Sequence, residues 1–363
     1  MPTSDEWLRV RAHLGEHRHA LAVRATAEYP DTPTVADSPL LTDPRWIPAA
    51  PMPLDLVRLH RAEGGRPGVD GTEDLVDAIL PPSTGGRLRS YSAAMAALAA
   101  PRVFQDRSTY RLLEADLTGP PGRLVFGAGT YFDGIDVGEA CAHEYAARDL
   151  GLLDDLPLRT AVGAPCDPAR RPTNVAISTL TLRVDPDGAA TFFLHWRDPK
   201  RVGHAGGLYQ VLPVGVFQAS GEEAWHLDND FSLWRCVVRE FAEELRGESE
   251  DYGGDRGPID YEAWPLAARL TDALGDRVRA WYLGMGVDPL TLATDLLTVV
   301  AIDAELFDEV FGAVVRTNDE GRVLDAQPFD ADTVRRFVHD EPTQAAGAAL
   351  LALAWEHRGT VVR

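Results

Sequence analysis

Two hydrophobic patterns, one with the period of a strand and one with the period of a helix, occur in the second half of the chain. Short apolar runs bounded by polar loops predict strands at 192–197 and 207–217, the second of them broken by a turn. A longer β-branched run at 290–302 is typical of a buried strand. A short helix is expected at about 331–338, and the alanine-rich stretch 343–355 predicts a closing helix. These patterns predict that this half of the chain contains both strands and helices.

One further helix has the clearest period of the whole chain. Its apolar residues recur every four positions, at Leu233, Val237, Phe241 and Leu245. The residues that precede it are candidates for the N-cap: Asp228, Asn229 and Asp230. Gly247 follows the last apolar residue, where a glycine commonly ends a helix. The sequence therefore predicts a helix that is buried along one side.

This helix carries three carboxylates and an arginine within little more than one turn: Arg239, Glu240, Glu243 and Glu244. A helix brings side chains three and four positions apart together, and like charges at that spacing repel each other. A divalent cation would offset the repulsion, and Mg²⁺ and Mn²⁺ prefer oxygen ligands. Because the glutamates lie beside the apolar stripe, they are expected at the rim of a cleft. The alternative is a surface helix on which Arg239 and Glu243 form an ordinary pair.

The segment 239–245 resembles the core of the Nudix box, whose pattern is G-x5-E-x7-R-E-U-x-E-E-x-G-U, with U a bulky apolar residue. It fits R-E-U-x-E-E at every position. The closing glycine is Gly247, one place late, and the early glutamate falls on Phe231. Four acids lie near that position, each out of register: Glu222, Glu223, Asp228 and Asp230. Upstream, Val214 replaces the first glycine of a Leu-Pro-Gly-Gly segment. The resemblance covers roughly residues 173–363.

The resemblance implies a mixed-sheet α/β/α sandwich and Mg²⁺- or Mn²⁺-dependent hydrolysis of a nucleoside diphosphate linked to another group. Glu243 and Glu244 would hold the metal, and Glu240 would be a further ligand or the base that activates water. Arg239 would orient the glutamates. In the family the early glutamate braces its loop against that arginine, so its absence predicts a less rigid loop. One more metal-binding carboxylate is expected after the box; Glu320 is the first choice, followed by Glu305 and Glu309.

The expected substrate-binding residues lie just before the box: Arg197, Lys200, Arg201, Tyr209 and Gly215. The three basic residues form a patch in a loop next to the expected diphosphate, and arginine makes bidentate contacts with phosphate. The alternative is a solvated loop that carries charges without function. Aromatic stacking on a base is expected from Tyr209, Trp225 or Trp234. The resemblance implies that Gly215 would let the backbone approach metal and diphosphate closely.

Length predicts two domains, because 363 residues exceed what one core usually holds. Residues 1–172 would form an N-terminal α+β accessory domain with a proline-rich wrapping or linking segment at 28–55. Residues 173–363 would form the Nudix-like domain. An insertion at about 248–289 interrupts it and would serve either as a cap over the cleft or as a structural flap.

The formal net charge of −21 argues against binding to nucleic acid, which needs a basic surface, and leaves a small anionic molecule as the expected partner. No apolar run has the roughly 18 residues that span a membrane. The polar N-terminus and three scattered cysteines predict a cytoplasmic protein. Arginine predominates, with Lys200 the single lysine, which is typical of a high-GC bacterial genome. A homodimer stays open.

Two other functions remain open at this stage. The first is a Nudix-fold sensor that binds a nucleotide-type ligand and regulates a partner without turnover. The absent early glutamate, Val214 and the displaced Gly247 favour the sensor, whereas the intact core at 239–244 favours catalysis. The second is an isomerase that acts on a diphosphate substrate.

Overall fold

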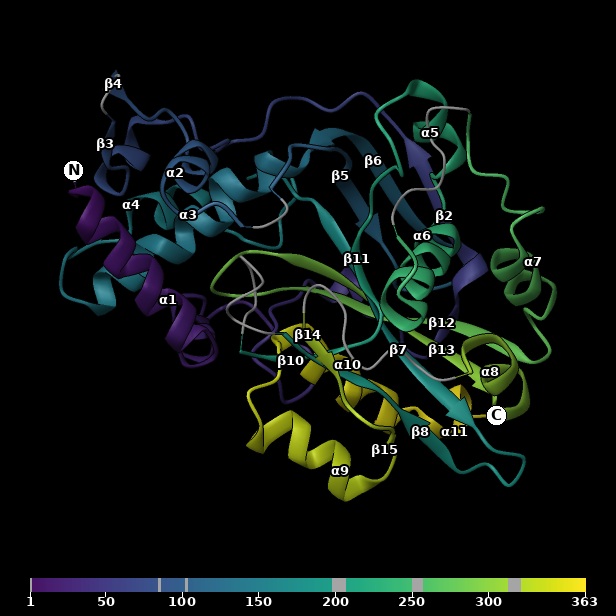
Figure 1. Ribbon diagram of the computed structural model, residues 1–363. Helices are drawn as coiled ribbons and strands as arrows, with labels where there is room; N and C mark the ends of the chain where they lie inside the picture. Colours follow the sequence, from purple (N-terminus) through teal and green to yellow (C-terminus); the bar gives the residue numbers. More distant parts are fainter. Residues whose placement is uncertain (1, 84–85, 102–103, 198–206, 250–256, 313–320) are drawn as a thin grey trace.

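A mixed β-sheet with helices on both faces organises the second half of the chain (Figure 1). The computed structural model describes residues 2–83, 86–101, 104–197, 207–249, 257–312 and 321–363. In these residues the main sheet has seven strands, which are, in spatial order, β1 (Met52–Pro53), β12 (Val278–Val287), β13 (Thr294–Asp303), β7 (Val175–Val184), β8 (Ala190–Phe192) and β15 (Gln327–Pro328), with β11 (Val214–Val216) paired to β7.

Strands β13 and β7 are parallel over ten residues, from Thr294 opposite Val175 to Asp303 opposite Val184. The other pairings of the main sheet are antiparallel. Because side chains alternate along a strand, each of these central strands supplies two buried faces. Ile177 and Val300 belong to the core beneath α6 (Leu233–Glu240) and α8 (Ala304–Phe311), while Leu180 and Val299 pack with α10 (Ala345–Glu356). The predicted α/β/α sandwich is confirmed.

The N-terminal part combines helices with a second sheet. Its helices are α1 (Ser4–Ala25), α2 (Tyr91–Leu98), α3 (Tyr131–Asp149) and α4 (Pro157–Val162). The sheet has the order β2 (Val57–Arg61), β6 (Gly122–Thr130) and β5 (Ser108–Asp116), in which β2 is parallel and β5 antiparallel to β6. Two short strands, β3 (Pro82–Ser83) and β4 (Gly86–Arg87), pair in antiparallel fashion.

The remaining elements complete the C-terminal part. A small sheet has the order β10 (Tyr209–Val211), β9 (Leu194–Arg197) and β14 (Gly321–Val323). The other helices are α5 (Ala224–Asn229), α7 (Pro265–Asp272), α9 (Ala331–Arg335) and α11 (Arg358–Val361). Both strand predictions before the box divide: 192–197 becomes β8 and β9, and 207–217 becomes β10 and β11. No helix among the described residues is long and apolar enough to cross a membrane.

The N-terminal and C-terminal parts share buried contacts. The ring of Tyr110 on β5 lies 4.6 Å from that of Phe217, and Thr109 forms a β-bridge with Gln218. The proline-rich segment wraps onto the edge of the main sheet, where β1 pairs with β12 and Leu41 bridges to Val287. Within the expected insertion, β12 is a long strand of this sheet. A division into domains at residue 172 stays a prediction.

Candidate functional site

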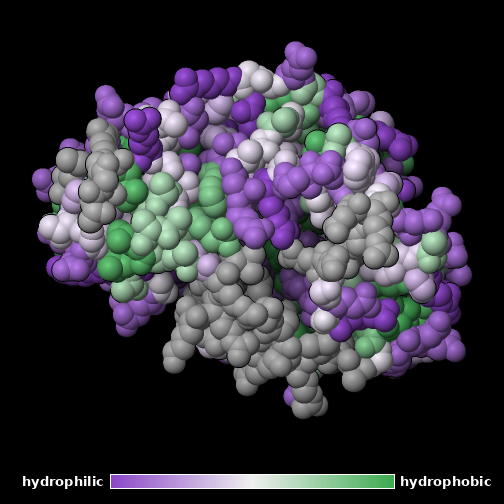
Figure 2. All heavy atoms as spheres, turned by 45° about the horizontal axis from the view of Figure 1, so that its top comes forward, coloured by the Kyte–Doolittle hydropathy of each residue, from purple (hydrophilic) through white to green (hydrophobic). Residues whose placement is uncertain are grey.

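A cavity of about 1110 Å³ opens at the ends of β7, β11 and β13. One wall is formed by the acidic end of α6 and the residues after it, and another by the start of α3 in the N-terminal part. Arginines also line it: Arg107, Arg171, Arg239 and Arg246. The face drawn in Figure 2 is mostly hydrophilic and is hollowed near its centre. The cavity therefore offers charges of both signs to one ligand.

The predicted helix forms, but its start differs from the prediction. Ser232 is the N-cap, and its side chain accepts a hydrogen bond from the backbone N–H of Arg235 at 3.4 Å. The proposed N-caps were wrong. Asp228 and Asn229 lie in the separate helix α5, of which Asn229 is the last residue, and Asp230 is buried against other side chains. The stretch between Gly215 and the helix is thus long enough to hold a short helix of its own.

The end of the helix explains the late glycine. After Glu240 the chain makes a π-helical turn, η5 (Phe241–Leu245), which holds more residues than an α-helical turn. Gly247 then takes a positive φ of 68°, and its backbone N–H donates to the carbonyl of Glu243 at 3.1 Å. The wider turn accommodates one extra residue before this glycine closes the helix. Glu243 and Glu244 lie within this turn, so their positions differ from those on a regular α-helix.

The carboxylates dock on the backbone of β11. A Cβ atom at Gly215 would overlap the carboxylate of Glu240, so the glycine gives this side chain its place. The backbone N–H of Val214 donates to Oε1 of Glu244 at 3.1 Å. With Val214 in place of the first glycine, the backbone of β11 still contacts the carboxylate of Glu244. All three glutamates, Glu240, Glu243 and Glu244, line the cavity.

Gly215→Ala is expected to displace the Glu240 carboxylate while it leaves the fold largely unchanged. The overlapping atoms are at the end of a flexible side chain, and the φ of Gly215 is not positive, so the expected loss of stability is below about 1 kcal/mol. Thermal unfolding would measure stability, and calorimetric titration with Mg²⁺ and inorganic pyrophosphate would measure the affinity of the site for these ligands. The control is Gly15→Ala, where the added methyl group meets open space. If Gly215→Ala and the wild type bind these ligands with equal affinity, Gly215 is not needed to place the Glu240 carboxylate in the site.

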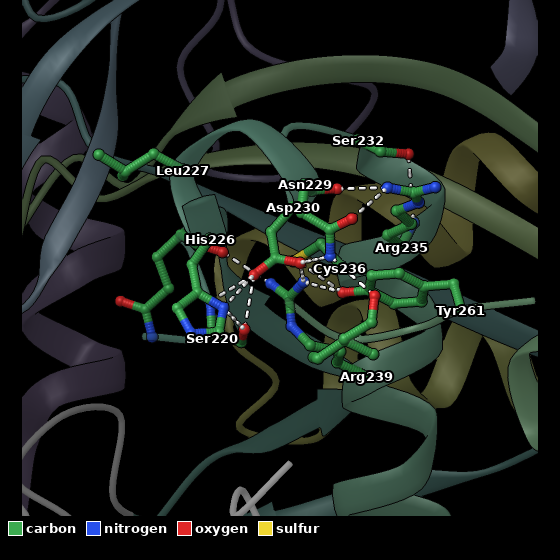
Figure 3. Close-up of polar contacts among 12 residues, drawn as sticks. Ser220, His226, Leu227, Asn229, Asp230, Ser232, Arg235, Cys236, Arg239 and Tyr261 are labelled. Atoms are coloured by element: carbon green, nitrogen blue, oxygen red, sulfur yellow. Dashed lines mark hydrogen bonds and ion pairs between the residues drawn. The ribbon is translucent and has the colours of Figure 1, made fainter. Parts of the chain in front are cut away.

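Arg239 is held by a buried network that the sequence did not reveal (Figure 3). Its guanidinium donates to the Tyr261 hydroxyl at 2.7 Å and to the Gln218 carbonyl at 2.6 Å, and it lies 3.6 Å from Oδ1 of Asp230. Asp230 also accepts from the backbone N–H of Ser220 at 2.8 Å and from the Ser220 hydroxyl at 2.6 Å. Asp230, one position before the family register, thus makes the contact with the arginine that was expected of the early glutamate. A less rigid loop stays a prediction.

The cavity also contains Asp295, which the sequence analysis missed. It is the second residue of β13 and is 1% exposed. The Ser178 hydroxyl donates to its Oδ1 at 2.8 Å, while Oδ2 has no hydrogen-bond partner among the described residues. Burial raises the pKa of Asp295 to about 7. A single acid inside an otherwise apolar and threonine-rich run was the signal that could have revealed it.

The other predicted site residues have different surroundings. Tyr209 packs against Phe337 at 5.4 Å, and its neighbour Gln210 lines the cavity. Glu305 pairs with Arg277, and Glu309 with Arg269, at the surface. The backbone of Arg197 pairs with Gly321 at the end of β9. Three predicted residues lie outside the described part of the chain: Lys200, Arg201 and Glu320.

The aromatic candidates and the cysteines differ in exposure. Trp225 is exposed, whereas Trp234 packs against the core and donates to the hydroxyl of Thr271 at 2.9 Å. The cysteines are buried free thiols: Cys141, Cys166 and Cys236. Burial raises the pKa of Cys236 to about 12, so this thiol is neutral. It contributes to the packing of α6, which we call the box helix.

Three glutamates, Glu240, Glu243 and Glu244, form what we call the acidic wall of the cavity. Its carboxylate oxygens are ligands that suit a hard divalent cation. Among the described residues, however, no group of three or more histidine, cysteine, aspartate or glutamate side chains is arranged to hold a metal ion. Mg²⁺ usually binds through one or two carboxylates together with water and substrate phosphates, and not in a cage of protein ligands. The wall therefore fits a cation that arrives with, or is completed by, an anionic ligand.

Comparisons with known proteins do not identify the function of this protein. No protein family and no curated protein sequence matches the chain. Among solved structures, it is similar to a NUDIX hydrolase from Alicyclobacillus acidocaldarius, with 16% identity. The match covers 50% of this chain and 91% of that chain, with a TM-score of 0.28. Resemblance at this level carries no argument about activity.

Proposed function

We propose that the protein hydrolyses the diphosphate linkage of a small molecule in which a nucleoside diphosphate is joined to another group, with Mg²⁺ or Mn²⁺. The observation that carries this proposal is the arrangement of the acidic wall. Glu240 sits on Gly215, Glu244 accepts from Val214, and both line one cavity with Glu243. A diphosphate bound there would complete the coordination of a cation that these carboxylates begin.

The charges in the cavity support an anionic ligand despite the net charge of −21. Arg107, Arg171 and Arg246 line it, and guanidinium groups match phosphate oxygens well. Arg171 is buried, and desolvation lowers its pKa to about 10, so it still carries its charge at neutral pH. Because more acids than arginines line the cavity, these arginines would attract a diphosphate together with a bound divalent cation.

Each residue of the acidic wall has a role in this proposal. Glu243 and Glu244 would hold the cation, and Glu240 would be a further ligand or the base that takes a proton from water. The cation, when bound, would neutralise charge on the diphosphate and lower the pKa of the attacking water. Arg239 acts as a positioning residue, since its contacts with Asp230 and Tyr261 fix the helix relative to its loop.

Glu244→Gln is expected to lower metal-dependent turnover by about 100-fold or more, because it removes a charge from the cation site. The amide oxygen can still accept the hydrogen bond of Val214, so the fold should persist. Product release would be measured across a panel of nucleoside diphosphates and diphosphate-linked compounds with Mg²⁺ or Mn²⁺. The matched control is Glu305→Gln, whose side chain is 91% exposed on α8. Equal turnover in both variants would rule out the acidic wall as the site of reaction.

A second function is favoured by a specific observation. One oxygen of Glu244 is already engaged by a backbone N–H, and the described residues contain no preformed metal site. Both features suit a sensor that binds a nucleotide-type ligand without turnover. Absence of turnover across the panel, together with higher thermal stability in the presence of the same compounds, would establish the sensor and overturn the hydrolase.

A further inference from the structure

The cavity extends past the acidic wall to the opposite face of the main sheet. Asp295 on β13 lies in register with Ala176 on β7, and Ala176 lies in register with Val216 on β11. Residues in register share a face of the sheet, whereas Gly215, the neighbour of Val216, faces the other way, towards Glu240. Asp295 therefore points to the face covered by α10, and Glu240 lies on the face covered by α6.

Two buried acceptors occur at this α10 end of the cavity. Oδ2 of Asp295 and Oε1 of Gln344 have no hydrogen-bond partner among the described residues. Both residues line the cavity, and they are 1% and 5% exposed. Gln344 is the N-cap residue of α10, and its backbone N–H donates to the carbonyl of Tyr209 at 2.9 Å. Buried polar atoms normally have partners, so two such acceptors beside one cavity indicate a ligand that supplies the donors.

We propose that Asp295 and Gln344 form a subsite for the organic part of the ligand, which donates hydrogen bonds to them from sugar hydroxyls or from the N–H groups of a base. This proposal rests on the proposed function, since the acidic wall would hold the diphosphate of the same molecule. The cavity, at about 1110 Å³, is far larger than a diphosphate needs and slightly exceeds the range of about 300–1,000 Å³ that is typical of pockets for drug-sized ligands.

The chemistry of the subsite would select among diphosphates. A ligand without donors would leave both acceptors buried and unsatisfied, and such a site discriminates strongly against it. Asp295 is also close enough to the negative charge of Asp288 for that charge to add to the effect of burial and raise its pKa. A donor from the ligand would stabilise the ionised carboxylate against both effects.

The test is binding by calorimetry at about pH 8, where Asp295 is ionised, with Mg²⁺ and four probes. The probes are inorganic pyrophosphate, ADP, inosine diphosphate and 2′,3′-dideoxy-ADP. The wild type is expected to bind ADP about 10- to 100-fold more tightly than pyrophosphate, the range expected of hydrogen bonds to a charged group. Asp295→Asn, which replaces the acceptor by a donor of the same shape, should remove that advantage and leave pyrophosphate binding within about twofold.

The analogues distinguish the two sources of donors. Weaker binding of the dideoxy compound in the wild type assigns the donors to the sugar, and weaker binding of inosine diphosphate assigns them to the amino group of the base. Gln344→Met is a second variant that removes an acceptor and should also reduce the preference for ADP. The matched control is Asp303→Asn at the other end of β13, where Asp303 pairs with Arg279 at the surface.

Two outcomes would overturn the subsite, and they differ in what they say about the diphosphate site. If the wild type binds pyrophosphate but gains nothing from the nucleoside, or if Asp295→Asn keeps the gain, the subsite is wrong and the proposed function stands. If the wild type binds none of the four probes, the proposed function has failed and the subsite fails with it.

Discussion

Asp230→Ala is expected to lower the free energy of unfolding by about 3–5 kcal/mol, the cost of removing one partner of a buried ion pair. Asp230 is fully buried, and it accepts hydrogen bonds from Ser220 and from the Tyr261 hydroxyl at 2.8 Å. Its removal leaves the buried guanidinium of Arg239 without this carboxylate and leaves the Ser220 donors unsatisfied. Urea unfolding, followed through the midpoint and the slope, would measure the loss.

The neighbouring acid provides a matched control for this prediction. Asp228 is 82% exposed and pairs with Arg61 at the surface, so Asp228→Ala should change stability by no more than about 0.5 kcal/mol. The loss of unfolding free energy for Asp230→Asn should lie between those for Asp230→Ala and Asp228→Ala, since asparagine keeps the shape of the side chain and one acceptor. A loss below about 1 kcal/mol for Asp230→Ala would show that Asp230 does not brace the box helix.

Asp295→Asn is expected to make stability less dependent on pH. The pKa of Asp295 is about 7 in the folded protein because of burial, against about 3.9 for an aspartate in an unfolded chain. As pH rises from about 4 to 7, the unfolded chain releases this proton while the folded protein keeps it, so stability falls. The full loss is on the order of 4 kcal/mol, of which about 2 kcal/mol lies between pH 5.5 and 8.

In Asp295→Asn the amide side chain cannot ionise, so this variant should not lose stability in this way as pH rises. We expect Asp295→Asn to be more stable than the wild type at about pH 8, with the difference shrinking towards about pH 5.5. Chemical unfolding across this range would measure it, with Asp303→Asn as the control, because Asp303 is partly exposed and pairs with Arg279. A difference from the wild type that stays constant with pH would show that Asp295 does not titrate in this range.

The sequence predicted those parts of the structure that local periodicity controls. The four-residue spacing of Leu233, Val237, Phe241 and Leu245 predicted the buried box helix, and the β-branched run at 290–302 predicted β13. Such patterns depend on which side of an element faces the core, and that information lies in neighbouring residues. The mixed-sheet α/β/α arrangement was expected from the resemblance of residues 239–245 to the Nudix box, and not from these patterns.

The sequence was a weaker guide where a residue acts through distant partners. The sequence offered Asp230 as an N-cap, whereas the structure buries Asp230 against Arg239 and Tyr261 and gives the N-cap position to Ser232. The extra residue before Gly247 looked like a defect in the motif, because a π-helical turn leaves little trace in hydrophobic periodicity. Asp295 was overlooked because the run around it read simply as a strand.

By itself, the sequence determined the helix that carries the glutamates, the strand β13, the closing helix α10 and the segment in which the acidic residues gather, because the hydrophobic pattern of each lies in neighbouring positions. Only the tertiary structure decided that Glu240 docks on Gly215, that Asp230 takes the bracing position one residue out of register, and that Asp295 lies at the far end of the same cavity. The physical reason is that burial and partner charge depend on segments far apart in the chain, which meet only when the sheet assembles.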